Sequence, residues 1–318
     1  DGAYAFLNQP EGSYDVRQVV PAGFVQTFPS TMLIGDGNLS FQQVVRDGVD
    51  GADGLFNPTS VAVSPDDAHV YVTALTDDSV AAFSRNPVTD ELTFVQVLTD
   101  GVDGVEGLAT ARQVVISPDG MHAYTVGETD DAVSVFSRDP NTGELAFLQV
   151  LQDGVAGVDG LDGARAVAVS ADGQSVYAVG FEDDALAVFS RDGNTGLLTF
   201  EQVLFDNIGG NDGLFEPRGV DVSPDGRTVY TAAREDNAVG VFSRDPDTSL
   251  LTFVEVVRNG QNDSGGTLVQ GLQQIQSVQV SPDGQNVYTT SQDSHALSVF
   301  DRDPDTGVLT FTQVLVDG

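Results

Sequence analysis

Apolar residues alternate with polar or small ones in short runs along the chain, and turn residues separate the runs. Between residues 112 and 151, four such runs occupy positions 112–117, 122–127, 132–138 and 145–151. Because successive side chains of a strand point to opposite faces, this pattern predicts four consecutive β-strands. In the last run both sets of alternating positions are mostly apolar, so we expect both faces of the resulting sheet to be covered.

The segments between these runs have the composition of tight turns. SPDG at 117–120 places Pro where a φ near −65° is favoured and Gly where a positive φ is expected. TDDA at 129–132 predicts a short acidic turn. DPNTGE at 139–144 predicts a hairpin loop with Gly in the left-handed position. The four strands should therefore form one antiparallel sheet.

This unit repeats through the chain. The turn marker recurs as SPDD at 64–67, SPDG at 117–120, SADG at 170–173, and SPDG at 223–226 and 281–284. A second marker, typified by LTFVQVLTDG, begins at residues 39, 92, 145, 198, 251 and 309, and QPEG at 9–12 is a disguised copy of the first. We therefore divide the single domain 1–318 into six repeats, at about 1–56, 57–109, 110–162, 163–215, 216–273 and 274–318.

Six four-stranded units that are apolar on both faces predict an all-β fold, a β-propeller in which each blade packs against its neighbours. The first strand of each unit supports this prediction. Val114 and Ile116 place large side chains on one face, whereas Ala166 and Ala168 place small ones on the other face in the next unit. Large residues against small ones let twisted sheets nest. We expect six blades, with seven as the alternative.

The charge of the chain limits the classes of partner that it can bind. The formal net charge is −35, and all 13 basic residues are Arg. Nucleic acid is excluded, since phosphate binding needs a basic face. Membrane insertion is excluded because no apolar run reaches the ~18 residues of a spanning helix. The chain has no Cys, which rules out disulfides and thiolate metal sites. We expect an extracellular or cell-surface protein, acidic in the manner of halophilic proteins, from which any signal peptide has been removed.

Two stretches carry a family resemblance, SPDGMHAYTVGETDDAVSVFSRDPNTGELAF at 117–147 and EPRGVDVSPDGRTVYTAAREDNAVGVFSRDPDT at 216–248. They resemble the lactonase-type β-propellers, the group of 6-phosphogluconolactonase and carboxymuconate cyclase with their YVTN-repeat surface relatives. The resemblance extends over nearly the whole chain. It implies the propeller fold and a site of His, Arg and Glu at the mouth of the central channel. This chain departs from the family's pattern in two ways. Such enzymes usually have seven blades, whereas we expect six here. We also expect no His of this chain at the mouth of the channel.

Arginines in two repeat positions are the main candidates for chemistry. Arg112, Arg165 and Arg218 start the first strand of three repeats, where the others have Tyr4, Thr59 and Gln276. In a propeller this position rims the channel, so the three guanidinium groups either pair with carboxylates or hold an anion. The second set recurs before the hairpin loop in five repeats and predicts a structural pair with a turn Asp; it comprises Arg85, Arg138, Arg191, Arg244 and Arg302.

Other residues would complete a site at the channel mouth. The ligand-binding candidates are Arg112, Arg165, Arg218 and Gln276. The catalytic residue is unassigned, with Asp221, Glu128 and Glu182 as candidates. Asp221 stands where other repeats have mostly apolar residues, so it needs a partner, either Arg218 or a water in the channel.

Acidic loops such as DGVDGADGL at 47–55 join one predicted blade to the next. Their aspartates are candidate calcium ligands, namely Asp47, Asp50, Asp53, Asp100 and Asp103. The spacing of three does not match an EF-hand loop, so Ca²⁺ is a possible ligand and no cofactor is firmly implied. We do not expect His69, His122 and His295 to meet in one metal site.

These observations support two functions. The first is a non-catalytic secreted or cell-surface propeller, a binding or assembly module whose acidic face binds cations. Its partners would be other proteins, glycans or a small anionic ligand. The alternative is a lactone hydrolase of the 6-phosphogluconolactonase type that acts at the mouth of the central channel. The close similarity of the repeats favours the first, since a catalytic site breaks symmetry.

Overall fold

A computed structural model describes residues 42–317 of the chain, and all 20 of its strands lie in four-stranded sheets. The first sheet contains β1 (Pro58–Val63), β2 (His69–Ala74), β3 (Ser79–Arg85) and β4 (Leu92–Thr99). The second contains β5 (Ala111–Ile116), β6 (His122–Gly127), β7 (Ala132–Arg138) and β8 (Leu145–Gln152). The third contains β9 (Ala164–Val169), β10 (Ser175–Gly180), β11 (Ala185–Arg191) and β12 (Leu198–Phe205). The fourth contains β13 (Pro217–Val222), β14 (Thr228–Ala233), β15 (Ala238–Arg244) and β16 (Leu251–Arg258). The fifth contains β17 (Ile275–Val280), β18 (Asn286–Ser291), β19 (Ala296–Arg302) and β20 (Leu309–Val316).

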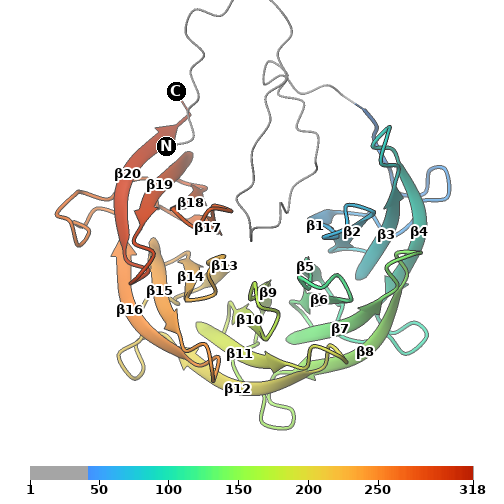
Figure 1. The fold of residues 1–318 in the computed structure, drawn as a ribbon, viewed down its shortest axis with the longest axis horizontal. Coiled ribbons are helices and arrows are strands. Elements are labelled where there is room, and N and C mark those ends of the chain that lie inside the picture. Colours follow the sequence, from blue (N-terminus) through green and yellow to red (C-terminus); the bar gives the residue numbers. More distant parts are fainter. Residues whose placement is uncertain (1–41, 318) are drawn as a thin grey trace, which may run out of the picture. The chain divides into compact units, whose positions relative to one another are not determined.

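Each sheet is an antiparallel meander with its strands in chain order. The predicted strands of residues 112–151 agree with β5 to β8 to within one residue at each end. Consecutive sheets pack against each other, with β1, β5, β9, β13 and β17 as the neighbouring inner strands, as Figure 1 shows. The all-β propeller is therefore confirmed, and residues 42–317 account for five of its blades. Most of the repeat predicted at 1–56, with Tyr4 and QPEG, lies outside the described residues.

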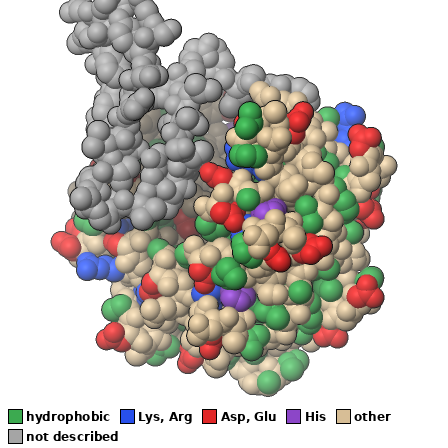
Figure 2. All heavy atoms as spheres, turned by 45° about the vertical axis from the view of Figure 1, so that its right-hand side comes forward, with side chains coloured by type: hydrophobic (Ala, Val, Ile, Leu, Met, Phe, Trp, Pro, Cys, Tyr) green, Lys and Arg blue, Asp and Glu red, His purple; other side chains and the backbone are tan. Residues whose placement is uncertain are grey.

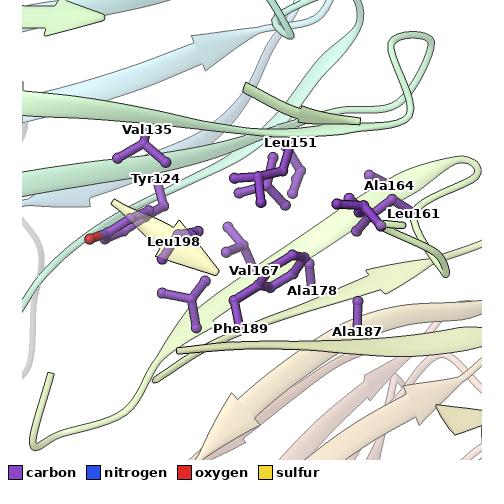
Figure 3. Close-up of a cluster of buried hydrophobic side chains, with 14 residues drawn as sticks. Tyr124, Val135, Leu151, Leu161, Ala164, Val167, Ala178, Ala187, Phe189 and Leu198 are labelled. Atoms are coloured by element: carbon purple, nitrogen blue, oxygen red, sulfur yellow. The ribbon is translucent and has the colours of Figure 1, made fainter. Parts of the chain in front are cut away.

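The apolar core lies between neighbouring sheets. One cluster joins Tyr124 and Val135 of the second sheet to Val167 and Phe189 of the third, and Figure 3 shows these side chains converging. Within every sheet a Phe on the third strand meets one on the fourth edge to face, as in Phe189 and Phe200, whose ring centroids are 5.8 Å apart. The prediction that both sheet faces are covered is confirmed for the second, third and fourth sheets.

A buried arginine clamps each of four blade junctions. Arg191 of β11 donates to Tyr124 Oη at 2.6 Å, to the Gly173 carbonyl at 2.9 Å, and to Asp119 of the preceding blade at 2.7 Å. Arg138, Arg244 and Arg302 pair in the same way with Asp66, Asp172 and Asp225. The predicted structural pairing with a turn Asp is confirmed, and the Asp belongs to the SPDG turn of the preceding blade. Within residues 42–317, the carboxylate that Arg85 pairs with is Asp90 of its own hairpin, and Arg85 Nη1 also donates to the Asp67 carbonyl at 3.1 Å.

Two histidines belong to these clamps. His122 Nδ1 accepts a hydrogen bond from Arg191 at 2.8 Å, and His69 Nδ1 accepts one from Arg138 at 2.7 Å. Burial, and then the adjacent guanidinium, lower the pKa of both imidazoles. They are therefore neutral structural groups. They lie in separate clamps, each bonded to its own arginine.

The junction between the third and fourth sheets departs from this pattern. At this junction, Ser175 and Ser249 take the repeat positions that His122 and Gly196 have at the junction between the second and third sheets. The two serine hydroxyls hydrogen-bond each other at 2.6 Å. Tyr177 Oη and Arg244 Nε, both buried, have no hydrogen-bond partner here. The equivalent atoms of Tyr124 and Arg191 bond each other. The tyrosine hydroxyl therefore supports the clamp at one junction and not at the next.

The surface is acidic, as the sequence indicates. Figure 2 shows Asp and Glu side chains spread over the face that it presents, with few Arg side chains between them. Among the described residues, no helix is long and apolar enough to cross a membrane.

Candidate functional site

Five inner strands line one cavity with a volume of about 500 Å³. Arg112, Arg165 and Arg218 lie on its wall, each as the second residue of its strand, β5, β9 or β13. Thr59 takes the same position on β1 and also lines the cavity. The repeat thus places one residue per blade at the same depth, and three successive blades supply a guanidinium group.

Arg112 and Arg165 share one carboxylate. Glu128, in the turn after β6, accepts a hydrogen bond from Arg112 Nε and another from Arg165 Nη2 at 2.7 Å. All three side chains are partly buried. Glu128 therefore neutralises one of two adjacent positive charges. This sharing leaves the arginine pair with one net positive charge.

Arg218 is the least neutralised arginine of the three. Its Nη1 donates to Gln276 Oε1 of β17 at 2.8 Å, and its buried Nε has no hydrogen-bond partner. It makes no ion pair with any residue of 42–317. Burial, followed by the charges of Arg165 and Arg234, lowers the pKa of Arg218. This group can therefore gain charge-assisted hydrogen bonds from an anion.

Phe181 holds two of the guanidinium groups side by side. Arg165 lies 4.0 Å from the centroid of its ring, and Arg218 lies 5.3 Å from it. Both distances are within the range of cation–π attraction. The ring thus offsets part of the repulsion between neighbouring cations without neutralising them.

The three carboxylates predicted as catalytic candidates differ in their partners. Glu128 is held by two arginines. Glu182, next to Phe181, is exposed to solvent and attracts Arg165, but its carboxylate makes no hydrogen bond or ion pair within the described part of the chain. A carboxylate with free lone pairs can accept a proton from water. Of the three, Glu182 is therefore the best placed to act as a base.

Asp221 lines the same cavity but is held by the backbone. Its Oδ2 accepts hydrogen bonds from Val280 N and Gln279 Nε2, each at 2.7 Å, and its Oδ1 accepts one from Val222 N at 2.9 Å. Burial raises its pKa to about 6 despite these bonds. Of the two partners expected for Asp221, Arg218 makes no hydrogen bond or ion pair with it among the described residues, and two of the three donors to Asp221 come from β17. This arrangement makes Asp221 a brace between β13 and β17.

The acidic loops gather carboxylates in a different combination from the predicted one. Within 42–317, two groups have three carboxylates whose ligand atoms lie within 4.8 Å of one another, namely Asp153, Asp159 and Asp183, and Asp206, Asp212 and Asp236. Each combines two loop residues with one from the turn between the second and third strands. Neither contains Asp47, Asp50, Asp53, Asp100 or Asp103. Asp47 and Asp100 instead accept hydrogen bonds from Leu55 N and Leu108 N, both at 3.0 Å.

One repeat position that distinguishes the blades escaped the sequence reasoning. Phe181 lies in the turn after the second strand, where the other four described blades have Leu75, Glu128, Arg234 and Gln292. Each of the five described blades has a different residue there, although the surrounding turn is repetitive. That variation breaks the symmetry of the repeat at the channel mouth. It was the signal in the sequence for a specialised site.

Comparisons with known proteins bear on the family and the fold of this chain. A family model described as "Lactonase, 7-bladed beta-propeller" matches residues 103–262, about half of the chain, and this range includes all three cavity arginines. The solved structure of a periplasmic gluconolactonase from Pseudomonas aeruginosa is 26% identical, with a TM-score of 0.64, over 84% of this chain and 72% of that one.

Two further structures share the fold. A putative 6-phosphogluconolactonase from Bacteroides uniformis is 20% identical, with a TM-score of 0.56, over 84% of this chain and 87% of its own. Hydrazine synthase from Kuenenia stuttgartiensis is also 20% identical, with a TM-score of 0.53, over 77% of this chain and 64% of that one. The fold thus occurs with unrelated chemistry, and the family assignment rests on the match to residues 103–262. On that match, this chain belongs to the lactonase family of seven-bladed β-propellers.

Proposed function

We propose that this protein hydrolyses a lactone at the mouth of the cavity lined by Arg112, Arg165 and Arg218. The observation that carries the proposal is Arg218, a partly buried guanidinium with one amide partner and a free Nε. The family match and the similarity to a gluconolactonase favour this alternative over a non-catalytic module.

The proposed chemistry is base-assisted addition of water. Glu182 removes a proton from a water molecule while its oxygen attacks the lactone carbonyl. Arg218 donates hydrogen bonds to the carbonyl oxygen, on which negative charge develops. The ring C–O bond then breaks, and the alkoxide that leaves takes up the proton, which gives the hydroxy acid. Arg165, held over Phe181, would bind a polar or anionic group of the substrate.

This assignment uses a carboxylate where the family resemblance implies a histidine. His69 and His122 are held in the clamps by Arg138 and Arg191. No histidine of the described residues lines the cavity. A base is still available, because Glu182 lies beside Arg165 with unused lone pairs.

We expect Glu182→Gln to reduce lactone hydrolysis on the order of a hundredfold, because it removes the base but keeps the shape of the side chain. Arg218→Gln should reduce it by a similar factor through loss of the oxyanion donor. The assay follows acid release from glucono-δ-lactone in a pH-stat, with the spontaneous rate subtracted.

Arg227→Gln is the matched control, since Arg227 is exposed and directly follows the SPDG turn at 223–226. It should retain the wild-type rate. A wild-type rate equal to the spontaneous one, or full activity of both Glu182→Gln and Arg218→Gln, would contradict the proposed hydrolysis.

We also propose that the acidic loops bind Ca²⁺, with Asp153, Asp159 and Asp183 as ligands. A comparison with the neighbouring group of carboxylates favours this proposal. In that group Arg258 supplies the positive charge, because it pairs with Asp212 and Asp236. The equivalent residue one repeat earlier is Phe205, so the Asp153 group has no such cation. Burial and the neighbouring carboxylates raise the pKa of Asp183. Clustered carboxylate oxygens are the ligands that Ca²⁺ prefers.

Millimolar Ca²⁺ should therefore raise the melting temperature by about 5 °C beyond the effect of NaCl at equal ionic strength, and EDTA should reverse the shift. Asp159→Asn should abolish the shift, whereas Asp305→Asn, an exposed change of equal charge, should preserve it. An identical response of all three proteins to Ca²⁺ and NaCl would show general screening and no specific site.

The location and the partners follow from the same reasoning. We propose an extracellular or cell-surface protein, a location supported by the acidic composition, the lack of Cys and the similarity to a periplasmic enzyme. Other proteins or glycans could bind through the calcium-bearing loops. The small anionic ligand would be the hydroxy acid that the reaction releases.

A further inference from the structure

A glutamine at one repeat position joins the outer strands of neighbouring blades. Gln202 of β12 donates from Nε2 to the Leu251 carbonyl of β16 at 3.1 Å and accepts from Leu251 N at 2.8 Å. The same two bonds recur in two equivalent pairs, Gln96 with Leu145 and Gln149 with Leu198. At each of these junctions one amide group therefore satisfies a backbone donor and a backbone acceptor of the next blade.

The junction between the fourth and fifth sheets has a glutamate at this position. Glu255 Oε1 in β16 accepts a hydrogen bond from Leu309 N at 2.8 Å, as the glutamines do. An ionised carboxylate has no hydrogen to donate, and no side chain of residues 42–317 donates to the Leu309 carbonyl. Leu309 is 0% exposed, so this buried carbonyl lacks the donor that Leu251 has. A buried acceptor without a partner destabilises the fold.

We propose that Glu255 is a protonation site, at which the folded protein binds a proton and donates it as a hydrogen bond to the Leu309 carbonyl. The carboxylate takes up the proton from solvent on Oε2, while Oε1 keeps its bond from Leu309 N. The resulting carboxylic acid has one donor and one acceptor, like the amide of Gln202. Glu255 is only partly buried, so solvent can deliver the proton. The junction between the fourth and fifth sheets therefore gains a hydrogen bond when the pH falls.

A second carboxylate at this junction favours the protonated form of Glu255. Asp263 lies in the loop 259–274, which is longer than the loop 206–216 at the preceding junction. It accepts hydrogen bonds from Thr267 N at 2.8 Å and from Phe311 N of β20 at 2.7 Å. Burial raises the pKa of Glu255, and the charge of Asp263 raises it further, against the opposing effect of the bond from Leu309 N.

The other charged groups on the surrounding strands have partners of their own. β20 contains no charged residue. The cations on β15, β16 and β19 are Arg244, Arg258 and Arg302, and each pairs with aspartates, namely Asp172, then Asp212 and Asp236, and Asp225. Asp301 of β19 accepts a hydrogen bond from Asn286 Nδ2 at 3.1 Å. Within residues 42–317, no cation therefore pairs with Glu255 to hold it in the ionised form.

Thermal unfolding of a Glu255→Gln variant tests the consequence for stability. At pH 8 the variant should melt about 2–4 °C above the wild type, because its amide donates to the Leu309 carbonyl at every pH. A carboxyl whose pKa is raised on folding stabilises the fold in its protonated form, so the difference should shrink as the pH falls to 5. Glu91→Gln removes the same charge from an exposed hairpin and should shift the melting temperature by less than about 1 °C at both pH values.

The reciprocal variant and a direct titration complete the test. Gln202→Glu should lower the melting temperature more at pH 8 than at pH 5. In wild-type protein labelled with ¹³C at the glutamate carboxyl groups, Glu255 Cδ should titrate at a higher pH than Glu91 Cδ. Its resonance can be assigned through the nuclear Overhauser effect to the Leu309 amide proton. Titration of Glu255 at or below the pH of Glu91 would overturn the proposal, as would an equal gain from Glu255→Gln at pH 5 and pH 8.

Discussion

Arg191→Met should lower the free energy of unfolding by about 3–5 kcal/mol, the range for breaking a buried ion pair by removing one partner. The Arg191 side chain is 2% exposed, and its nitrogens bind Asp119, Tyr124, His122 and the Gly173 carbonyl. Methionine fills much of the volume but leaves Tyr124 Oη, His122 Nδ1 and the Gly173 carbonyl buried without this donor, whereas the Asp119 carboxylate, which is 37% exposed, is left to pair with water. Urea denaturation, monitored by tyrosine fluorescence and circular dichroism, measures this difference in the free energy of unfolding.

Arg85→Met is the control for this change, because Arg85 has the same repeat position but pairs with Asp90, which is 58% exposed. An exposed pair of this kind contributes about 0.2–1 kcal/mol, so the loss should stay near that range. A second control uses the tyrosines. Tyr124→Phe removes an acceptor from Arg191 and should cost about 1–3 kcal/mol, whereas Tyr177→Phe removes a hydroxyl that has no partner. Equal losses for Arg191→Met and Arg85→Met would contradict the clamp.

Gly196→Ala should lower the free energy of unfolding by about 2–5 kcal/mol through overpacking and backbone strain together. A Cβ on Gly196 would lie 2.1 Å from His122 Cδ2, and the residue has a φ of +74°. The imidazole cannot move away without breaking its bond to Arg191. Urea denaturation again measures the loss.

Gly154→Ala separates strain from overpacking. Its φ is +68°, and an added Cβ meets nothing within 4 Å, so only the strain of about 1–2 kcal/mol should remain.

The junction at Ser175 and Ser249 supplies a further check. Ser249 keeps a φ of +65° without glycine, beside a Ser where the preceding junction has a His. The double variant His122→Ser, Gly196→Ser should therefore be more stable than the sum of its single changes. Simple additivity would show that the histidine is not what requires glycine.

The repeat pattern was sufficient to predict the fold, because each blade depends on local information. Alternating apolar residues set the strands, and SPDG and DPNTGE set the turns, so β5 to β8 agree with prediction to within one residue. Neighbouring blades have the same construction. The side chains that cover the apolar face of one blade are therefore found in the next repeat. The same logic predicted that Arg138 and its equivalents pair with a turn Asp. It could not show that this Asp lies in the preceding blade, since residues 72 positions apart meet only through packing.

The channel mouth depended on the tertiary structure. Arg112, Arg165 and Arg218 could be placed together from the sequence, because one repeat position lines one cavity. Their hydrogen-bond and ion-pair partners could not be predicted, since a side chain at the mouth can pair with groups from several blades. Glu128 binds two arginines, Arg218 reaches Gln276, and Asp221 bonds to the backbone of β17. The sequence by itself determined which residues face the channel, because strand alternation and the repeat fix direction. Only the tertiary structure decided which charges remain unpaired, because pairing depends on distances between blades that no local pattern encodes.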